Sequence, residues 1–308
     1  MAKRMLDCVT SDFQGFTKED WLSSISGSEG RVIACESIGT VLPMLGNITN
    51  AEFTASMGAD ILLLNIFDVE DPVIQGLPPV DKKDCIRELK RLTGRMVGIN
   101  LEPVEDSYES EDPDSMWKMS PGRKATPENA ARACEMGVDM VLLTGNPGNG
   151  VSNQAITDTL RRLKALLGDR LILAAGKMHA SGIPSEAGEH IITGRDVEEF
   201  IGAGADIVLL PAPGTVPGIT TEYVRGLVKE AHSRGVLTMT SIGTSQEGAD
   251  VETIRQIALM CKMAGTDIHH LGDSGYTGMA LPENILAYSK AIRGARHAYR
   301  RMAVSVNR

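Results

Sequence analysis

A phrase that occurs four times constrains the fold of this chain more than any other feature. Each copy has a glycine, a small or β-branched residue, an aspartate and then a largely apolar run. The copies are "MGADILLLN" (57–65), "MGVDMVLLTG" (136–145), "AGADIVLLPA" (203–212) and "AGTDIHHLGD" (264–273). The glycine suits the end of a helix, and the apolar run suits a buried strand. The sequence therefore predicts four repeated helix-to-strand junctions.

Four further strand candidates alternate with these copies: "RVIACES" (31–37), "RMVGINLEP" (95–103), "RLILAAGK" (170–177) and "RGVLTMTSIG" (234–243). Apolar residues at helical spacing predict helices at 82–93, 153–167, 222–234, 250–264 and 284–297. Apolar strands that alternate with amphipathic helices indicate parallel strands covered on their outer face. Eight such units predict an α/β fold, a single-domain (β/α)8 TIM barrel. A doubly wound sheet is the alternative, but it rarely uses eight equal units.

The barrel is expected over residues 31–297. An N-terminal extension (1–30) with a short helix at 17–25 precedes it, and we expect this segment to close the barrel floor. A basic C-terminal tail (298–308) follows, as a solvated helix end or as a subunit contact in a homo-oligomer.

Opposite charges mark the starts of neighbouring strands. By the barrel rule, this N-terminal rim serves stability and not chemistry. We expect contacts there between the aspartates of the repeat and the arginines that open the other strands, namely Asp60, Asp139, Asp206 and Asp267 with Arg31, Arg95, Arg170 and Arg234.

Composition narrows the class of partner. The net charge is −9 and no long basic stretch occurs, which disfavours nucleic acid or a membrane surface. No apolar run approaches the ~18 residues needed to cross a bilayer, and the N-terminus lacks the apolar core of a signal peptide. The five cysteines have no metal-ligand spacing, which suits reduced thiols in a cytoplasmic protein.

Catalytic groups of such barrels come from the C-terminal ends of the strands. Those ends carry a concentration of polar side chains that stability does not explain, and this concentration indicates an enzyme. The candidate catalytic residues are Lys177, His179, Glu36 and Glu102. The candidate substrate-binding residues are Asn65, Asn100, Thr144, Asn146, His270 and Asp273.

Lys177 and His179 are two residues apart, so in an extended strand they point the same way. Lys177 fits a Schiff-base lysine, a fixed cation for a carboxylate or phosphate, or a strand-end lysine paired with Glu36 or Glu102. We favour the cation, because nothing in the sequence marks a carbonyl substrate. His179 fits a general acid/base, since the usual pKa of histidine lies near neutrality.

The loops after the seventh and eighth strands, 241–250 and 271–284, suit a phosphate because they are rich in Gly, Ser and Thr. The candidate phosphate-binding residues are Ser241, Gly243, Thr244, Gly272, Ser274 and Gly275. In the alternative, Thr244 and Glu247 form a capping box that starts the next helix without a ligand. Asp273 would repel a phosphate unless a cation intervened.

A divalent metal such as Mg²⁺ is a further alternative, with Glu36, Glu102 and His179 as candidate ligands. No HExxH or HxH sequence supports it, and the DxD sequence at 112–114 contains none of these ligands. His269 and His270 are adjacent, so only one of them can face the barrel interior, and the other is expected to pack against helices.

The phrases "INLEPV", "LTGNPG", "GKMH", "PGTVPGIT", "IGTSQEGAD" and "IRQIALMCKMAGTDIHHLGDSGY" carry a resemblance over nearly the whole chain. They resemble an uncharacterised bacterial TIM-barrel family whose members are labelled haloacid-dehalogenase-like hydrolase or phosphoenolpyruvate-phosphonomutase-like protein. The first label implies a nucleophilic aspartate in a DxDx[TV]-like element, but the chain has only Asp112-Pro113-Asp114, followed by Ser-Met. The second implies a lysine–cysteine–histidine loop, which "GKMHASG" does not match, so that label is fold-level analogy.

These observations predict an enzyme that acts on a small anionic metabolite, phosphorylated ones included, by acid/base chemistry of the lyase, isomerase or hydrolase type. A metal-dependent hydrolase and a non-catalytic sensor that binds a sugar phosphate are the alternatives.

Overall fold

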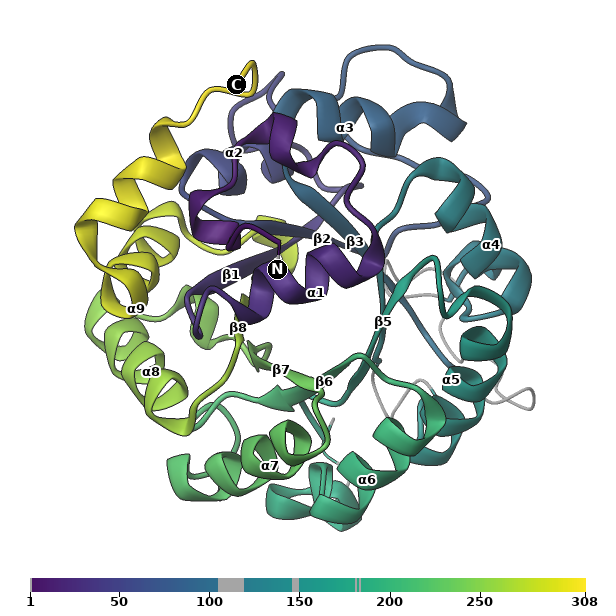
Figure 1. Ribbon diagram of the computed structural model, residues 1–308, viewed down its shortest axis with the longest axis vertical. Helices are drawn as coiled ribbons and strands as arrows, with labels where there is room; N and C mark the ends of the chain where they lie inside the picture. The colour runs from purple at the N-terminus through teal and green to yellow at the C-terminus, as the bar shows by residue number, and fades with distance from the viewer. Residues whose placement is uncertain (1, 105–118, 146–149, 181, 183) are drawn as a thin grey trace.

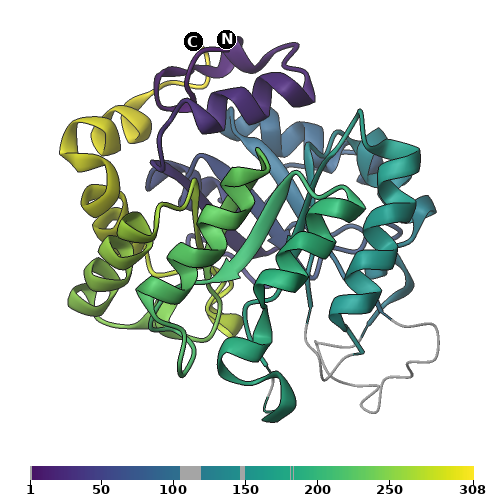
Figure 2. The same ribbon diagram turned by 60° about the horizontal axis from the view of Figure 1, so that its bottom comes forward.

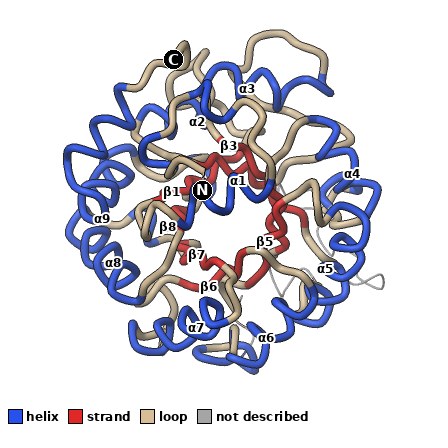
Figure 3. Tube along the Cα trace, viewed as in Figure 1, coloured by secondary structure: helices blue, strands red, loops and turns tan. Residues whose placement is uncertain are grey.

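The computed structural model describes residues 2–104, 119–145, 150–180, 182 and 184–308. Eight parallel strands close into a barrel in chain order, and helices surround it (Figures 1 and 3). The strands are β1 Val32–Ile38, β2 Ile61–Asn65, β3 Met96–Leu101, β4 Met140–Leu143, β5 Ile172–Gly176, β6 Ile207–Pro211, β7 Leu237–Ile242 and β8 Ile268–Leu271. The α-helices are α1 Lys18–Ser26, α2 Asn50–Ser56, α3 Cys85–Thr93, α4 Pro127–Met136, α5 Asn153–Leu167, α6 Gly194–Ala203, α7 Thr221–Ser233, α8 Val251–Ala264 and α9 Pro282–Ala303. The predicted (β/α)8 barrel is confirmed.

The repeated glycines lie just after helices α2, α4, α6 and α8. Their φ angles are 104° at Gly58, 97° at Gly137, 107° at Gly204 and 93° at Gly265. Side chains with a β-carbon are strained in this left-handed region, which is why glycine ends these helices. The expected helix-to-strand junction is therefore present in all four copies.

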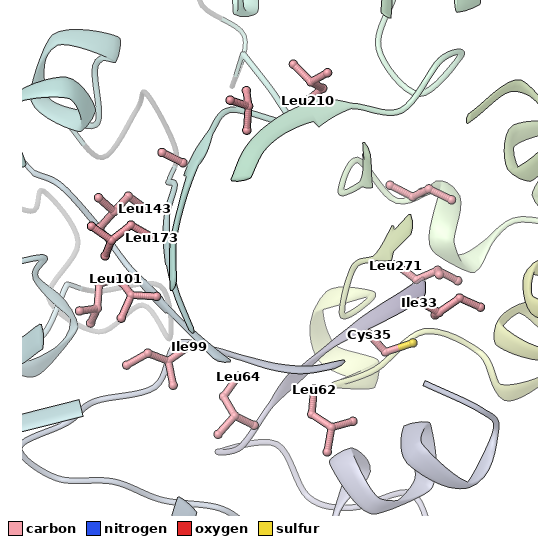
Figure 4. Close-up of a cluster of buried hydrophobic side chains, with 14 of the residues drawn as sticks. Ile33, Cys35, Leu62, Leu64, Ile99, Leu101, Leu143, Leu173, Leu210 and Leu271 are labelled. Atoms are coloured by element: carbon pink, nitrogen blue, oxygen red, sulfur yellow. The ribbon is translucent and has the colours of Figure 1, made fainter. Parts of the chain in front are cut away.

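The strands alternate between two apolar environments. In β1, Val32 and Ala34 belong to the cluster inside the barrel, whereas Ile33 and Cys35 belong to the cluster between barrel and helices. Figure 4 shows Ile33, Cys35 and Leu62 pointing outward from the ring of strands. Burial on both faces removes apolar area from water and makes these strands continuous hydrophobic runs.

The N-terminal extension closes the barrel floor, as expected. Met5, Trp21 and Ile25 belong to the inner apolar cluster, and Lys18 Nζ lies 2.6 Å from Asp206 Oδ2. Figure 2 shows this segment across one end of the barrel, with the C-terminus beside it. Helix α9 continues to Ala303, so the first part of the expected tail is helical.

Each aspartate of the repeat bridges two strands. Backbone N–H groups of Ile33, Val97, Leu173 and Thr238 donate to the carboxylates of Asp60, Asp139, Asp206 and Asp267, at 2.9, 3.0, 2.8 and 2.8 Å. Each aspartate also donates its own N–H to the carbonyl of that same residue, at 2.8 to 3.2 Å. Both groups of the aspartate therefore hold one residue of the preceding strand and determine the register between the two strands.

The expected ion pairs between these aspartates and the strand-opening arginines are wrong. Among the ion pairs of the described residues, Arg31 pairs with Glu29, and Arg234 pairs with Glu198 and Glu230. Helices supply the charge partners instead: Lys18 and Lys164 for Asp206, Lys90 for Asp139, His232 for Asp267, and Arg293 with Arg301 for Asp60. Many of these cations lie in the last turn of their helix, where they also complement the helix dipole at the barrel floor.

The cysteines are free, and four of the five are buried. Within the described ranges, no helix is long and apolar enough to span a bilayer.

Replacing Asp206 with alanine should lower the free energy of unfolding by about 3 kcal/mol. The change leaves the buried Lys18 without its carboxylate and the Leu173 N–H without its acceptor. Urea unfolding measures the loss. Asp158→Ala, which removes an exposed pair with Arg161, is the control and should cost less than about 0.5 kcal/mol. Equal losses in the two variants would contradict the proposed role of Asp206.

Candidate active site

A cavity of about 440 Å³ opens at the C-terminal ends of the strands. Its wall contains most of the predicted catalytic and substrate-binding residues: Glu36, Asn65, Asn100, Glu102, Thr144, His179 and Asp273. His270 and Lys177 are buried but are not among the described lining residues. Asn146 lies outside the described residues, as do Asp112 and Asp114.

A hydrogen-bonded chain of side chains crosses the wall from β1 to β8. Asn100 Nδ2 donates to Glu36 Oε1 and, at 3.2 Å, to Asn65 Oδ1. Asn65 Nδ2 in turn donates to Asp273 Oδ2 at 2.7 Å. Two amides therefore orient the two carboxyl groups, and the strand register brings all four residues together.

Glu36 is the most perturbed carboxyl group of this wall. It is 4% exposed, and burial raises its pKa well above the usual range. The negative charge of Asp273 raises it further, whereas the hydrogen bond from Asn100 acts in the opposite direction. Glu36 is thus a carboxyl group whose surroundings favour the protonated form and which faces a cavity, as a general acid requires.

Four buried polar atoms of this wall have no hydrogen-bond partner among the described residues. They are Asn100 Oδ1, Glu102 Oε2, Thr144 Oγ1 and Glu247 Oε2. Unsatisfied buried polar atoms are rare in folded proteins, because each costs free energy. Their position around one cavity indicates a site for a polar ligand.

Backbone strain gathers at the same end of the barrel. Among the described non-glycine residues with positive φ, Ile66, Ser245 and Ser274 follow strands β2, β7 and β8, with φ of 55°, 77° and 56°. A β-branched residue such as Ile66 is an outlier in this region, and it lines the cavity. Its N–H is held by Asn65 Oδ1 at 2.9 Å. Strain of this kind is often found at functional sites.

The two adjacent histidines of β8 face opposite ways, as predicted. His269 contacts Tyr288 of α9 at 2.9 Å and the Gly30 carbonyl at 3.0 Å. His270 faces inward, where its Nδ1 lies 2.6 Å from Ser241 Oγ and its Nε2 lies 3.9 Å from Glu36 Oε2. Burial lowers the pKa of His270 to about 3, so this ring is neutral. It lies beside Glu36 but is not among the described residues that line the cavity.

The expectation that Lys177 and His179 both face the cavity is half correct. Strand β5 ends at Gly176, and Ile172 and Ala174 of that strand face inward. Met178 continues this series of inward-facing residues and lines the cavity. Lys177 alternates with them, so by strand geometry its side chain points outward from the barrel, and it is 1% exposed. His179 reaches the cavity because it lies beyond the end of the strand. Burial and then the positive charge of Lys177 lower the pKa of His179.

The β3 side of the cavity contains an ion pair that the sequence did not reveal. Arg123 Nη2 lies 2.6 Å from Glu102 Oε1, and both side chains are largely buried. Burial raises the pKa of Glu102, and Arg123 opposes this shift. Arg123 follows a long segment without a motif, so no sequence signal distinguished it from a surface arginine.

The loops after β7 and β8 differ from the expected phosphate site. Gly243 and Gly272 line the cavity. However, backbone N–H groups of Glu247, Ser274 and Ser245 interact with the carboxylate of Glu247, so a carboxylate of the protein takes the place expected for a phosphate. The Gly275 N–H donates to Asp273 Oδ1 at 2.8 Å. The remaining candidates do not line the cavity within the described chain: Ser241, Thr244, Ser274 and Gly275.

The capping box is also wrong, because helix α8 begins later than that alternative requires. Asp250 is the N-cap and accepts the Thr253 N–H at 2.8 Å. Glu247 is therefore free to turn toward the cavity. Burial raises its pKa, as does the nearby Asp273. Carboxyl groups of the protein occupy the side of the mouth on which a phosphate was expected.

The candidate metal ligands do not come together. Within the described part of the chain, no three His, Cys, Asp or Glu side chains are grouped closely enough to hold a metal ion. Glu102 pairs with Arg123 instead, and Glu36 accepts a hydrogen bond from the amide of Asn100. The described residues therefore give the expected metal site no support.

Comparison with known proteins identifies the family. A family profile described as "Domain of unknown function (DUF7916)" matches residues 6–308. The chain belongs to this family. An uncharacterised barrel family is thus confirmed, and neither the haloacid-dehalogenase label nor the phosphonomutase label is.

One segment is similar to a curated protein of Haemophilus influenzae named "Putative N-acetylmannosamine-6-phosphate 2-epimerase", with 34% identity over 89 residues. The match covers 29% of this chain and about a third (33%) of that relative's length. Among solved structures, a Schiff base-forming fructose-1,6-bisphosphate aldolase is similar with a TM-score of 0.55 and 15% identity, over 89% of this chain and 97% of that one. Orotidine 5′-phosphate decarboxylase from Pyrococcus horikoshii OT3 is similar with a TM-score of 0.50 and 17% identity, over 86% and 100%. The structural likenesses show the barrel fold.

The neutral His270 makes the folded protein sensitive to acid. Its pKa of about 3 lies below that of an unfolded histidine, about 6.5, so the unfolded state binds the proton first as the pH falls. This contribution to stability is complete above about pH 6.5 and declines toward pH 3, by up to ~1.4 kcal/mol per pH unit. Urea unfolding between about pH 7.5 and about pH 5 should therefore show a shallower pH dependence for His270→Gln than for wild type. Parallel curves would exclude this explanation.

Proposed function

We propose that this protein is an enzyme that transfers a proton on a small phosphorylated metabolite at the C-terminal mouth of its barrel, in an isomerase or lyase reaction. The observation that carries the proposal is Glu36, a buried carboxyl group that lines the cavity, is oriented by Asn100 and has its pKa raised by burial. The relative named as a sugar-phosphate epimerase supports the substrate class. The fold supports a site at this end of the barrel.

The charges of the cavity suggest how the substrate lies. On the β7–β8–β1 side, the carboxyl groups of Glu247, Asp273 and Glu36 have no Lys or Arg ion-pair partner among the described residues. On the β3 side, Arg123 pairs with the carboxylate of Glu102, and His179 follows β5. A phosphate beside Glu247 and Asp273 would be repelled whenever these groups are ionised. The anionic group of the substrate therefore lies toward Arg123 and His179, and its reacting carbon lies toward Glu36.

In this arrangement two groups share the proton transfer. Glu36 donates a proton to a carbonyl or hydroxyl oxygen of the substrate, and the Asn100 amide maintains the orientation of its carboxyl group. His179 is the partner base, since burial and Lys177 lower its pKa and keep it neutral. Lys177 acts as a fixed positive charge behind His179, not as a Schiff base.

Glu36→Gln keeps the shape and the hydrogen bonds of the side chain but cannot donate a carboxyl proton. We expect it to lower kcat by roughly 10²–10⁴-fold. The assay incubates the protein with a panel of sugar phosphates in D₂O and measures deuterium incorporation by mass spectrometry. Glu222→Gln, on the exposed face of α7, is the matched control and should retain full activity. Stabilisation by a panel compound without any exchange or turnover would favour a non-catalytic sensor.

Arg123→Gln should act on binding more than on chemistry. Removal of the guanidinium is expected to raise KM roughly tenfold for a phosphorylated substrate, with a smaller change in kcat. Arg123→Lys should recover part of this loss because it keeps the charge. His179→Ala should instead lower kcat. An unchanged KM in Arg123→Gln would contradict the proposed orientation of the substrate.

A further inference from the structure

A second cavity lies at the opposite end of the barrel from the candidate active site. It has a volume of about 510 Å³ and lies between the N-terminal extension, helix α3 and the turn that leads from α3 into β3. Figure 2 shows the extension across this end of the barrel. Its lining combines aromatic rings with cationic side chains, and nothing in the proposed function uses it.

The rings form one contiguous cluster on the side of the extension. Phe13 stacks on Trp21 with ring centroids 4.8 Å apart, and Phe16 meets Trp21 edge-on at 5.0 Å. All three line the cavity. The chain has only five Phe and two Trp, so this concentration is not an effect of composition. Aromatic walls of this kind favour a flat ring as ligand.

Positive charge forms the opposite wall, on α3 and the turn before β3. Arg87, Lys90, Arg91 and Arg95 line the cavity, and Asp139 is the one acidic lining residue among those described. Lys90 pairs with Asp139 at 2.8 Å. Arg91 pairs with Glu88 of the same helix, whereas Arg87 pairs with Asp84 just before it and also donates to the Glu135 carbonyl. Surface pairs contribute little free energy, so both arginines can turn toward a ligand.

A buried excess of positive charge lies directly behind this wall. Arg95 is 6% exposed and donates to the carbonyls of Ala59 at 2.8 Å and Arg301 at 2.9 Å. Asp60 pairs with both Arg293 and Arg301, and the charges of all three act on Arg95, so three guanidinium groups lie near one carboxylate. Burial and then the charge of Arg301 lower the pKa of Arg95 to about 9. Buried charges without a partner are costly, and an anion in the cavity would offset this cost.

We propose that this cavity binds a small planar aromatic anion, whose ring lies against Phe13, Phe16 and Trp21 and whose acidic group meets Arg91 and Arg95. Both requirements come from the lining. An uncharged ring would not neutralise the arginines, and an inorganic anion would not bury the exposed surface of the aromatic side chains. Because Trp21 is part of the wall, binding changes its fluorescence. Binding also stabilises the fold, since the extension and α3 are held together by the same ligand.

Fluorescence of the full-length Trp117→Phe protein, in which Trp21 is the remaining tryptophan, tests the proposal. Four probes are titrated: 1-naphthoate and adenosine monophosphate as aromatic anions, and adenosine and inorganic phosphate as their separate halves. Saturable binding of either aromatic anion, with much weaker binding of both halves, supports the proposal. Preference for naphthoate or for the nucleotide identifies the kind of anion. Failure of both aromatic anions, or equal binding of inorganic phosphate, overturns it.

Matched variants locate the binding. Arg91→Gln should weaken the binding of the aromatic anion roughly fivefold and reduce its thermal stabilisation, whereas Arg87→Gln, which removes a charge from the same wall without a direct contact, should weaken it less. Arg161→Gln is the control. Arg161 makes a similar exposed ion pair with Asp158, three residues earlier on α5, and does not line the cavity. Unchanged affinity in both α3 variants overturns the site. The test needs no turnover, so its result is independent of whether the proposed reaction is correct.

Discussion

The double contact between each repeat aspartate and the preceding strand is the interaction on which the rest of the structure depends. Asp60 holds Ile33 by two hydrogen bonds, so Ala34 pairs with Ile61 and Glu36 pairs with Leu63. A slip of one residue would turn every side chain of the strand to the other face. Glu36 would then face the helices, and the cavity would lose its buried acid.

The two ends of the barrel manage buried charge in different ways. At the floor, cations from the last turns of helices meet carboxylates that also accept backbone N–H groups. These carboxylates have a charge partner, which makes the floor a structural element. At the mouth, Glu36 and Asp273 are oriented by asparagine amides and have no cation as hydrogen-bond donor among the described residues. Burial there raises the pKa values of Glu36 and Asp273. Carboxyl groups with raised pKa values are suited to proton transfer, which is why such groups are common in active sites.

Much of this could be predicted because periodicity is a local property. The strands, the helix-ending glycines and the opposite orientation of His269 and His270 follow from alternation and from backbone geometry. The ion pairs of the floor could not be predicted in the same way. Lys90, His232 and Arg301 reach the aspartates only after the helices pack against the barrel, and many other cations have the same local sequence environment.

The candidate site shows the same division. Glu36, Asn65 and Asn100 were found because strand ends are visible in the sequence. Lys177 was placed on the wrong side because parity alone does not say which face of β5 is the inner one. The capping box of Thr244 and Glu247, the alternative to a phosphate site, is wrong although the predicted helix starts at 250, and only the structure shows that Glu247 lines the cavity.

The sequence by itself determined the barrel, its eight strands and the end at which polar groups gather, because repeat period and residue type are encoded along the chain. Only the tertiary structure decided which groups share the cavity. Burial, the Glu36–Asn100 contact and the pairing of Arg123 with Glu102 join residues from different strands and loops. Their pKa values and orientations depend on distances through space, and these exist only once the barrel has closed.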